Sequence, residues 1–176
     1  HPFRSKWYHN YGYGNLRDYG LEDKKVTVEQ LADRHDFIDA DRVGIYGHSG
    51  GGFMSTAAML VYPDFFDVAV SSAGNHTNDI YNRWWSETHH GVEEVIEGDS
   101  VSFKYDIAKN PDLAKNLKGK LMLTTGDRDN NVHHANTVRM PEFDVAFYAG
   151  TIVHELTHIA GYHHRGNRAT SANRRS

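Results

Sequence analysis

Short runs of adjacent apolar residues alternate along the chain with segments whose apolar residues are spaced more widely. The runs predict buried strands at 43–46, 66–71, 120–125 and 143–148. The segments before, between and after them predict helices at 21–35, 51–62, 131–140 and 151–161. Residues 1–20 and 75–98 are polar and aromatic and predict loops, the second with a helical turn or two. Strands that alternate with helices predict an α/β fold with a mainly parallel sheet and flanking helices.

The length and composition are those of one globular domain. The chain has 176 residues, of which 39% are hydrophobic and 24% are charged. We therefore expect a single domain over residues 1–164 and a polar, basic tail over residues 165–176. The net charge of −4 does not favour a nucleic-acid surface, and no apolar run reaches the length of a membrane span.

The chain has no cysteine but 13 histidines. The absence of cysteine excludes a disulfide framework and a thiolate nucleophile, although it leaves the cellular compartment open. The histidines provide imidazoles for proton transfer or metal binding. The first residues are His1-Pro2 rather than methionine, as expected of a processed product or a fragment.

One glycine-rich turn has the arrangement that a serine nucleophile needs. Gly47-His48-Ser49-Gly50-Gly51 matches the Gly-x-Ser-x-Gly pattern between a predicted strand and a predicted helix. A serine hydroxyl attacks efficiently when it stands clear of the backbone, beside a base and near amide donors for the oxyanion. The glycines tolerate such a turn, and the Gly50 N–H is the expected oxyanion donor. The alternative is a serine that only caps a helix.

A serine hydrolase of this fold places its acid and then its histidine after the serine. Asp127 and Asp129 both follow the predicted strand at 120–125, and either could instead serve only as a turn residue. The candidate bases after the last predicted strand are His154, His158, His163 and His164. Spacing alone does not choose among them.

Residues 10–136 resemble the peptidase domain of the prolyl oligopeptidase family, in its dipeptidyl-peptidase-IV-like branch. The matching stretches are YGNLRDYG (13–20), IDADRVGIYGHSGGGF (38–53), SSAGNH (71–76), NRWWSE (82–87) and GDRDNNVH (126–133). Several motifs in the same order make a chance match improbable. The resemblance implies a truncated α/β-hydrolase that acts as a serine peptidase on short peptides, with a small or proline residue before the cut bond. It is also compatible with an exported or periplasmic protein.

The resemblance also implies roles for individual residues. The family pattern Gly-x-x-Asp-x-x-Val places the triad acid at Asp129, and Asn131 falls where the family has an asparagine close to the substrate. Tyr81 and Trp85 fall where the family lines the pocket for the residue before the cut bond, although both also suit a core. The base stays open: His154 is nearest to the family position, whereas His163 and His164 have a sequence separation from the acid closer to the usual one.

A second motif lies near the end of the chain. His154-Glu155-Leu156-Thr157-His158 is His-Glu-x-x-His, in which two histidines on one helix face bind Zn²⁺ and Glu155 acts as general base. Residues 147–168 resemble a zincin-like domain found in antirestriction proteins. No acidic residue follows Glu155, so His163 or His164 would have to be the third ligand. The alternative is an amphipathic helix with histidines on its surface.

Three hypotheses therefore follow from the sequence. The leading one is a serine peptidase that needs no cofactor, and the second is a zinc metallopeptidase using His154, Glu155 and His158. The third is a catalytically inactive α/β-hydrolase-like binding module, because these 176 residues contain no counterpart of the family's oxyanion tyrosine or first sheet strands. An incomplete sheet would have open edges, which predict self-association. The two motifs meet near residue 141, as expected of a fusion, a recombination product or an artificial sequence.

Overall fold

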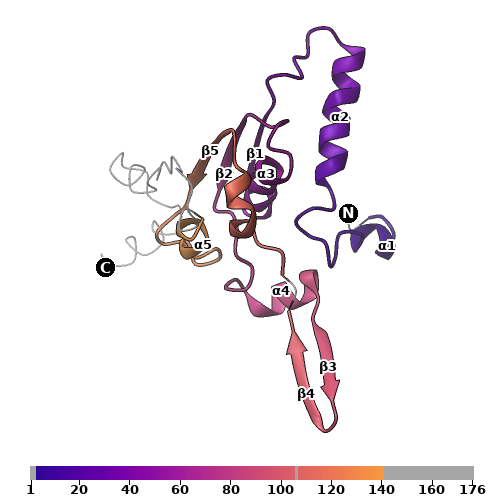
Figure 1. The fold of residues 1–176 in the computed structure, drawn as a ribbon, viewed down its shortest axis with the longest axis vertical. Coiled ribbons are helices and arrows are strands. Elements are labelled where there is room, and N and C mark those ends of the chain that lie inside the picture. The colour runs from indigo at the N-terminus through magenta and orange to yellow at the C-terminus, as the bar shows by residue number, and fades with distance from the viewer. Residues whose placement is uncertain (1–2, 106, 141–176) are drawn as a thin grey trace, which may run out of the picture.

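The computed structural model describes residues 3–105 and 107–140 of the chain (Figure 1). Its central feature is a parallel sheet of three strands, which are β1 (Gly44–His48), β2 (Val68–Ser72) and β5 (Lys120–Thr124). The strand order is β1-β2-β5, so β2 is central and the other two are edge strands. All three strands form at predicted apolar runs, with bounds that differ by one or two residues. The structure confirms the predicted α/β class and the parallel sheet.

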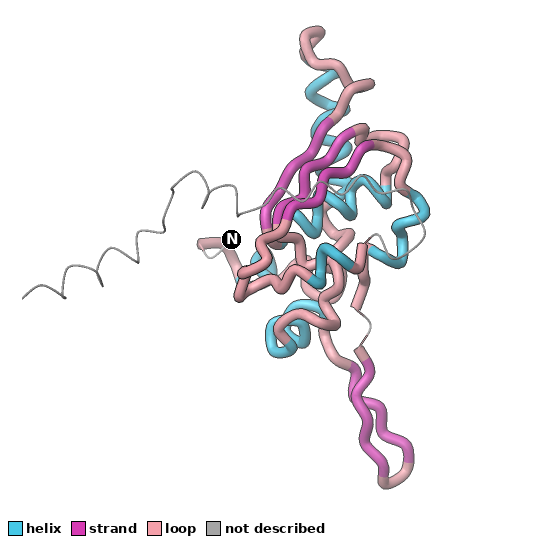
Figure 2. Tube along the Cα trace, turned by 90° about the vertical axis from the view of Figure 1, so that its left-hand side faces the viewer, coloured by secondary structure: helices cyan, strands magenta, loops and turns pink. Residues whose placement is uncertain are grey.

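Helix α3 (Gly50–Val61) packs against one face of this sheet (Figure 2). The contact is close because Ala57 and Ala58 are small and completely buried, and they lie near Ala69 of β2 in the same hydrophobic core. Helix α2 (Leu21–Arg34) lies outside α3 and buries Leu21 in that core. The predicted helices at 21–35 and 51–62 are thus confirmed. Within the described residues, no helix is long and apolar enough to cross a membrane.

Strand alternation leaves the opposite face of the sheet open. Residues 69, 71, 121 and 123 face α3 and are buried, whereas Tyr46, Val68 and Val70 on the other face are exposed. Parallel sheets are usually covered on both faces. The described part of the chain therefore supplies one of the two helical layers that such a sheet normally has.

Several short elements precede, connect or follow the three strands and the helices α2 and α3. Helix α4 (Arg83–His90) provides the helical turns predicted within 75–98, and helix α5 (Ala135–Val138) is shorter than the helix predicted at 131–140. Three elements are absent from the sequence-based predictions. These are α1 (Lys6–His9), the 3₁₀ helix η1 (Pro111–Asn116) and the antiparallel hairpin of β3 (Glu93–Glu97) and β4 (Ser100–Lys104).

The hairpin extends away from the three-stranded sheet (Figure 1). Its residues are mostly exposed and six of the ten in its two strands are charged or hydroxylated, so the apolar run that marks a buried strand is missing. The predicted strand at 143–148, the predicted helix at 151–161 and the predicted tail at 165–176 lie outside the described residues.

Candidate active site

The turn between β1 and α3 holds Ser49 in a strained backbone conformation. Its φ is +57° and its ψ is −122°, a combination that L-residues rarely adopt and that costs about 1–3 kcal/mol. Two backbone hydrogen bonds support it: the Ser49 N–H donates to the Ser72 carbonyl at 2.8 Å, and the Ser49 carbonyl accepts from the Phe53 N–H at 3.0 Å. The predicted strand–turn–helix context of Ser49 is therefore present, and the strain concentrates on the serine itself.

The amide next to Ser49 is available to a ligand. Gly50 is the first residue of α3 and is exposed, and the N–H groups of a first helical turn have no acceptor within the helix. The helix dipole adds partial positive charge at the same end. An oxyanion formed at Ser49 would meet this end of α3, as the sequence predicts for Gly50.

The candidate acid lies in the loop after β5. Asp129 is half-buried, and its Oδ1 accepts hydrogen bonds from the backbone N–H groups of Asn131 and Val132 at 2.9 and 3.0 Å. These two bonds fix the carboxylate, and within the described residues its second oxygen Oδ2 makes no hydrogen bond or ion pair. Asp127 is exposed and has no such support. The local geometry therefore favours Asp129 over Asp127.

The carboxyl ends of the three strands lie together because the sheet is parallel and in register. The loop after β2 and the loop after β5 are joined there by a hydrogen bond from the Tyr81 hydroxyl to Asn131 Oδ1 at 2.9 Å. Tyr81 also meets Trp85 edge to face, with ring centroids 5.2 Å apart. The structure thus brings three of the candidate substrate-binding residues into one cluster.

This cluster includes two residues that the sequence-based prediction missed. His89 stacks on Trp85 with ring centroids 4.3 Å apart, and the ring of Tyr13 also contacts His89, with centroids 4.8 Å apart. His89 is four residues after Trp85 on α4, so helical spacing could have indicated the pair. Tyr13 comes from a loop far away in the sequence, and no local signal links it to Trp85.

The candidate base and the candidate metal ligands lie outside the described residues. This applies to His154, Glu155, His158, His163 and His164, so neither the triad nor the zinc hypothesis is tested at these positions. Within residues 3–105 and 107–140, no group of three or more histidine or acidic side chains is arranged to hold a metal ion.

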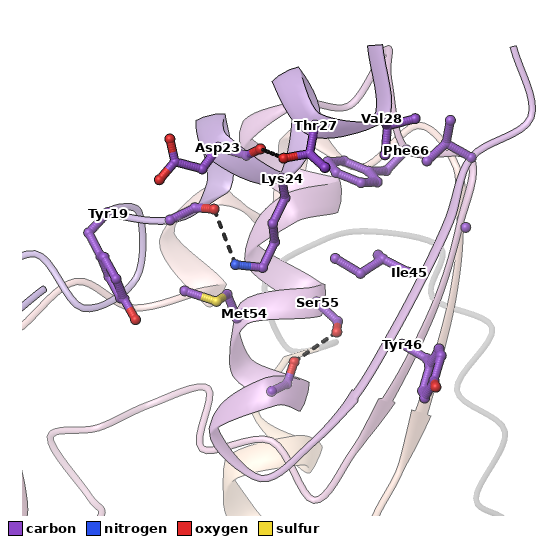
Figure 3. A pocket seen from close by; sticks show the side chains of 14 residues that line it. Tyr19, Asp23, Lys24, Thr27, Val28, Ile45, Tyr46, Met54, Ser55 and Phe66 are labelled. Atoms are coloured by element: carbon purple, nitrogen blue, oxygen red, sulfur yellow. Dashed lines mark hydrogen bonds between the residues drawn. The ribbon is translucent and has the colours of Figure 1, made fainter. Parts of the chain in front are cut away.

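A cavity of about 580 Å³ lies between α2, α3 and the edge strand β1 (Figure 3). Its wall includes Ile45 and Met54, and the Ser55 hydroxyl in it donates to the Gly51 carbonyl at 2.7 Å. None of the predicted site residues lines it. The candidate active site is therefore defined by the Ser49 turn and the strand ends, and not by this cavity.

Solved structures share the fold. The chain superposes on a dipeptidyl peptidase 4 of Porphyromonas gingivalis with a TM-score of 0.69 and 22% identity, over 96% of this chain and 24% of that one. A similar fit is found for a dipeptidyl aminopeptidase IV, described as putative, of Bacteroides ovatus, with a TM-score of 0.66 and 23% identity over 84% and 20% of the two chains. The predicted truncated α/β-hydrolase fold is confirmed by this likeness.

Curated proteins match in sequence. Human dipeptidyl peptidase 8 is 32% identical over 117 residues, which are 66% of this chain and 13% of that protein. Dipeptidyl peptidase family member 1 of Caenorhabditis elegans is 30% identical over 163 residues, 85% of this chain and 19% of that protein. The chain thus spans less than a fifth of the length of these relatives.

The family comparison covers almost the whole chain, from residue 2 to residue 175. It includes residues 147–168 and so gives the zincin-like resemblance of that segment no support. The matched range also contains Ser49 and Asp129, which follow the carboxyl ends of β1 and β5. The chain belongs to the prolyl oligopeptidase family.

Proposed function

We propose that this chain is the nucleophile-bearing part of a serine peptidase that hydrolyses peptide bonds. The observation that carries the proposal is the backbone of Ser49, which has a φ of +57° between β1 and the first turn of α3. Strain of this kind persists where the surrounding structure enforces it, and a serine that only caps a helix needs none. Family membership and the dipeptidyl peptidases among the relatives support the same reaction.

In the proposed mechanism, the Ser49 hydroxyl attacks the carbonyl carbon of the scissile bond while a histidine takes its proton. The histidine is one of His154, His163 and His164, and the Asp129 carboxylate orients it through Oδ2. The Gly50 N–H donates to the oxyanion of the tetrahedral intermediate. The protonated histidine then gives its proton to the leaving amine, and water releases the acyl group from Ser49. No cofactor takes part.

The substrate we propose is a short peptide with a small or proline residue before the scissile bond. The edge-to-face rings of Tyr81 and Trp85 offer flat apolar walls to such a side chain. Asn131 lies beside them through its hydrogen bond with Tyr81, and its side-chain amide nitrogen can donate to a carbonyl of the substrate.

The test is labelling of the full chain with a fluorophosphonate, with the modified residue located by mass spectrometry. An adduct on Ser49 that is lost in Ser49→Ala is the expected result. Absence of an adduct on folded protein would overturn the serine mechanism. Peptide hydrolysis that survives Ser49→Ala but stops on addition of a chelator would instead support the metallopeptidase hypothesis at His154 and His158.

A further inference from the structure

The first part of the loop that follows β2, residues 73–78, is mostly polar yet buried. Asn75, His76, Thr77 and Asn78 are each less than 10% exposed, and His76 is not exposed at all. Loops normally run over the surface because buried polar groups need partners. The burial of His76, which has no role in the proposed mechanism, therefore needs a physical explanation.

The hydrogen bonds around His76 fix both its tautomer and its charge. The Asn110 Nδ2 amide, which can only donate, lies 3.0 Å from His76 Nδ1, so Nδ1 accepts and carries no proton. The proton is then on Nε2, which faces Ser71 Oγ at 3.4 Å. The Ser71 hydroxyl is free to accept because its own proton goes to the Gly52 carbonyl at 2.8 Å. Burial lowers the pKa of His76 to about 3, in agreement with a neutral ring.

Both ends of this network lie on the first turn of α3. Ser71 donates to the Gly52 carbonyl, and the second hydrogen of the Asn110 amide goes to the Phe53 carbonyl at 2.8 Å. Gly52 and Phe53 belong to the same turn as Gly50, whose N–H is the proposed oxyanion donor. His76 is thus connected, through one residue on each side, to the backbone that sets the direction of that N–H.

The packing around the ring leaves it no alternative position. A Cβ atom at Gly74 would lie 2.5 Å from His76 Cε1 and 3.0 Å from the Gly52 carbonyl carbon, so Gly74 is squeezed between the ring and α3. A Cβ atom at Gly52 would in turn lie 2.7 Å from the Ser72 carbonyl oxygen. The ring, the loop and the helix turn must therefore move together.

We propose that His76 is a positioning residue of the Ser49 site, which holds the first turn of α3, and with it the Gly50 N–H, through Ser71 and Asn110. The inference rests on the proposed serine peptidase function. Removal of one oxyanion donor costs about 10²–10³-fold in rate, and a donor that is displaced rather than removed costs less. We expect a loss of roughly 10- to 100-fold when the network is cut.

The test compares His76→Phe, which keeps a planar ring and removes both hydrogen bonds, with His76→Asn, which keeps an acceptor for Asn110. Thr56→Val is the matched control, because Thr56 is a buried residue of α3 whose hydroxyl has no hydrogen-bond partner among the described residues. The readouts are the rate of fluorophosphonate labelling at Ser49, kcat and KM for peptide hydrolysis, and thermal unfolding. Amide hydrogen exchange at Ser49 and Phe53 reports the α3 turn without reference to activity.

The expected result is slower labelling and a lower kcat in His76→Phe with little change in KM, partial recovery in His76→Asn, and no change in Thr56→Val. Exchange at Ser49 and Phe53 should become faster in His76→Phe alone. A folded His76→Phe that labels at the unaltered rate overturns the inference. If the unaltered chain takes no label, the proposed function fails. The positioning role is then judged by hydrogen exchange alone, and it is overturned if exchange at Ser49 and Phe53 is unchanged in His76→Phe. Should His76→Phe not fold, Ser71→Ala cuts the same network and is judged by the same criteria.

Discussion

The turn that carries Ser49 requires glycine at residue 47 but has room for a side chain at residue 51. A Cβ atom at Gly47 would lie 2.2 Å from the Gly51 carbonyl oxygen and 2.3 Å from its carbon, both in the backbone. A Cβ atom at Gly51 would meet nothing within 4 Å. We expect Gly47→Ala to lower the free energy of unfolding by at least about 3 kcal/mol, since the backbone must move to make room.

Gly51→Ala is the matched control for this prediction. Alanine is favoured over glycine in a helix by roughly 0.5–1 kcal/mol, so the variant should be as stable as the unaltered chain or slightly more stable. Urea unfolding of the two variants measures the difference. Equal midpoints would show that the turn can relax around a side chain at residue 47.

The buried His76 also predicts how stability depends on pH. Its folded pKa of about 3 lies below the ordinary 6.5, so the unfolded chain binds the extra proton between these values. The groups that face the ring are uncharged: Ser71, Gly74 and Asn110. Its contribution to stability is therefore complete above pH 6.5 and is lost as the pH falls from 6.5 towards 3.

Between pH 7 and pH 5 this one residue should cost about 2 kcal/mol of stability, provided that its folded pKa stays well below 5. Urea unfolding at the two pH values, on the unaltered chain and on His76→Phe, isolates the effect. The difference between the two pH values should shrink by about 2 kcal/mol in the variant. An identical difference in both proteins would mean that His76 takes up its proton without unfolding.

The candidate catalytic residues were easier to predict from the sequence than the residues that support them. Ser49 and Asp129 stand in motifs whose spacing reflects a chemical requirement, and the structure gives both the local geometry expected. His76 and Asn110 carry no such signal, because buried and exposed polar residues look the same in a sequence. Their burial follows from the close approach of Gly52 and Gly74, which joins segments more than twenty residues apart.

At the scale of elements, apolar runs predicted the strands that pack on α3 and missed the hairpin of β3 and β4. The turn between these strands contains Gly98 with a φ of +62° followed by Asp99, and glycine with aspartate is a common hairpin signal. Charged residues on either side of this turn interrupt the apolar pattern, so the two strands were not predicted. A strand that packs against nothing has no need of the apolar pattern by which buried strands are recognised.

The hairpin should contribute little to the stability of the domain. A two-stranded hairpin alone in water is marginal, and Ile96, Val101 and Phe103 on one of its faces are all more than half exposed. Its base is held by Tyr105, which donates to Glu87 and accepts from Arg83 at 3.1 Å. Both contacts lie outside the two strands and would survive their removal.

We expect replacement of residues 93–104 by Asn-Gly to change the free energy of unfolding by less than about 1 kcal/mol, with no change in the labelling of Ser49. Thermal unfolding and fluorophosphonate labelling of the shortened chain provide the measurement. Loss of labelling in a folded variant would assign the hairpin a role in the site. Tyr105→Phe, which removes the hydroxyl between Arg83 and Glu87, tests the anchoring at the base separately.

At the scale of the whole molecule, we predict self-association, because no helix of residues 3–105 and 107–140 covers the second face of the sheet. Tyr46 is 87% exposed, and Val68 and Val70 are 46% and 38% exposed on the same face. The outer edge of β1 borders the cavity beside α2 and pairs with no other described strand. Unpaired strand edges and exposed apolar faces both favour contact with another chain. Association would thus cover the second face of the sheet, as is usual for parallel sheets.

The sedimentation coefficient of the chain should therefore rise with concentration, and the double variant Tyr46→Lys with Val70→Lys should remove this rise. Two lysines on the open face oppose association because each would lose its water on burial and would face a like charge across a two-fold contact. Ile96→Lys, on the exposed hairpin, is the control, since it adds a lysine far from the sheet. Association that persists in the double variant and disappears in Ile96→Lys would place the contact on the hairpin. A coefficient independent of concentration in the unaltered chain would mean that this face stays free of contact with other copies in spite of its apolar side chains.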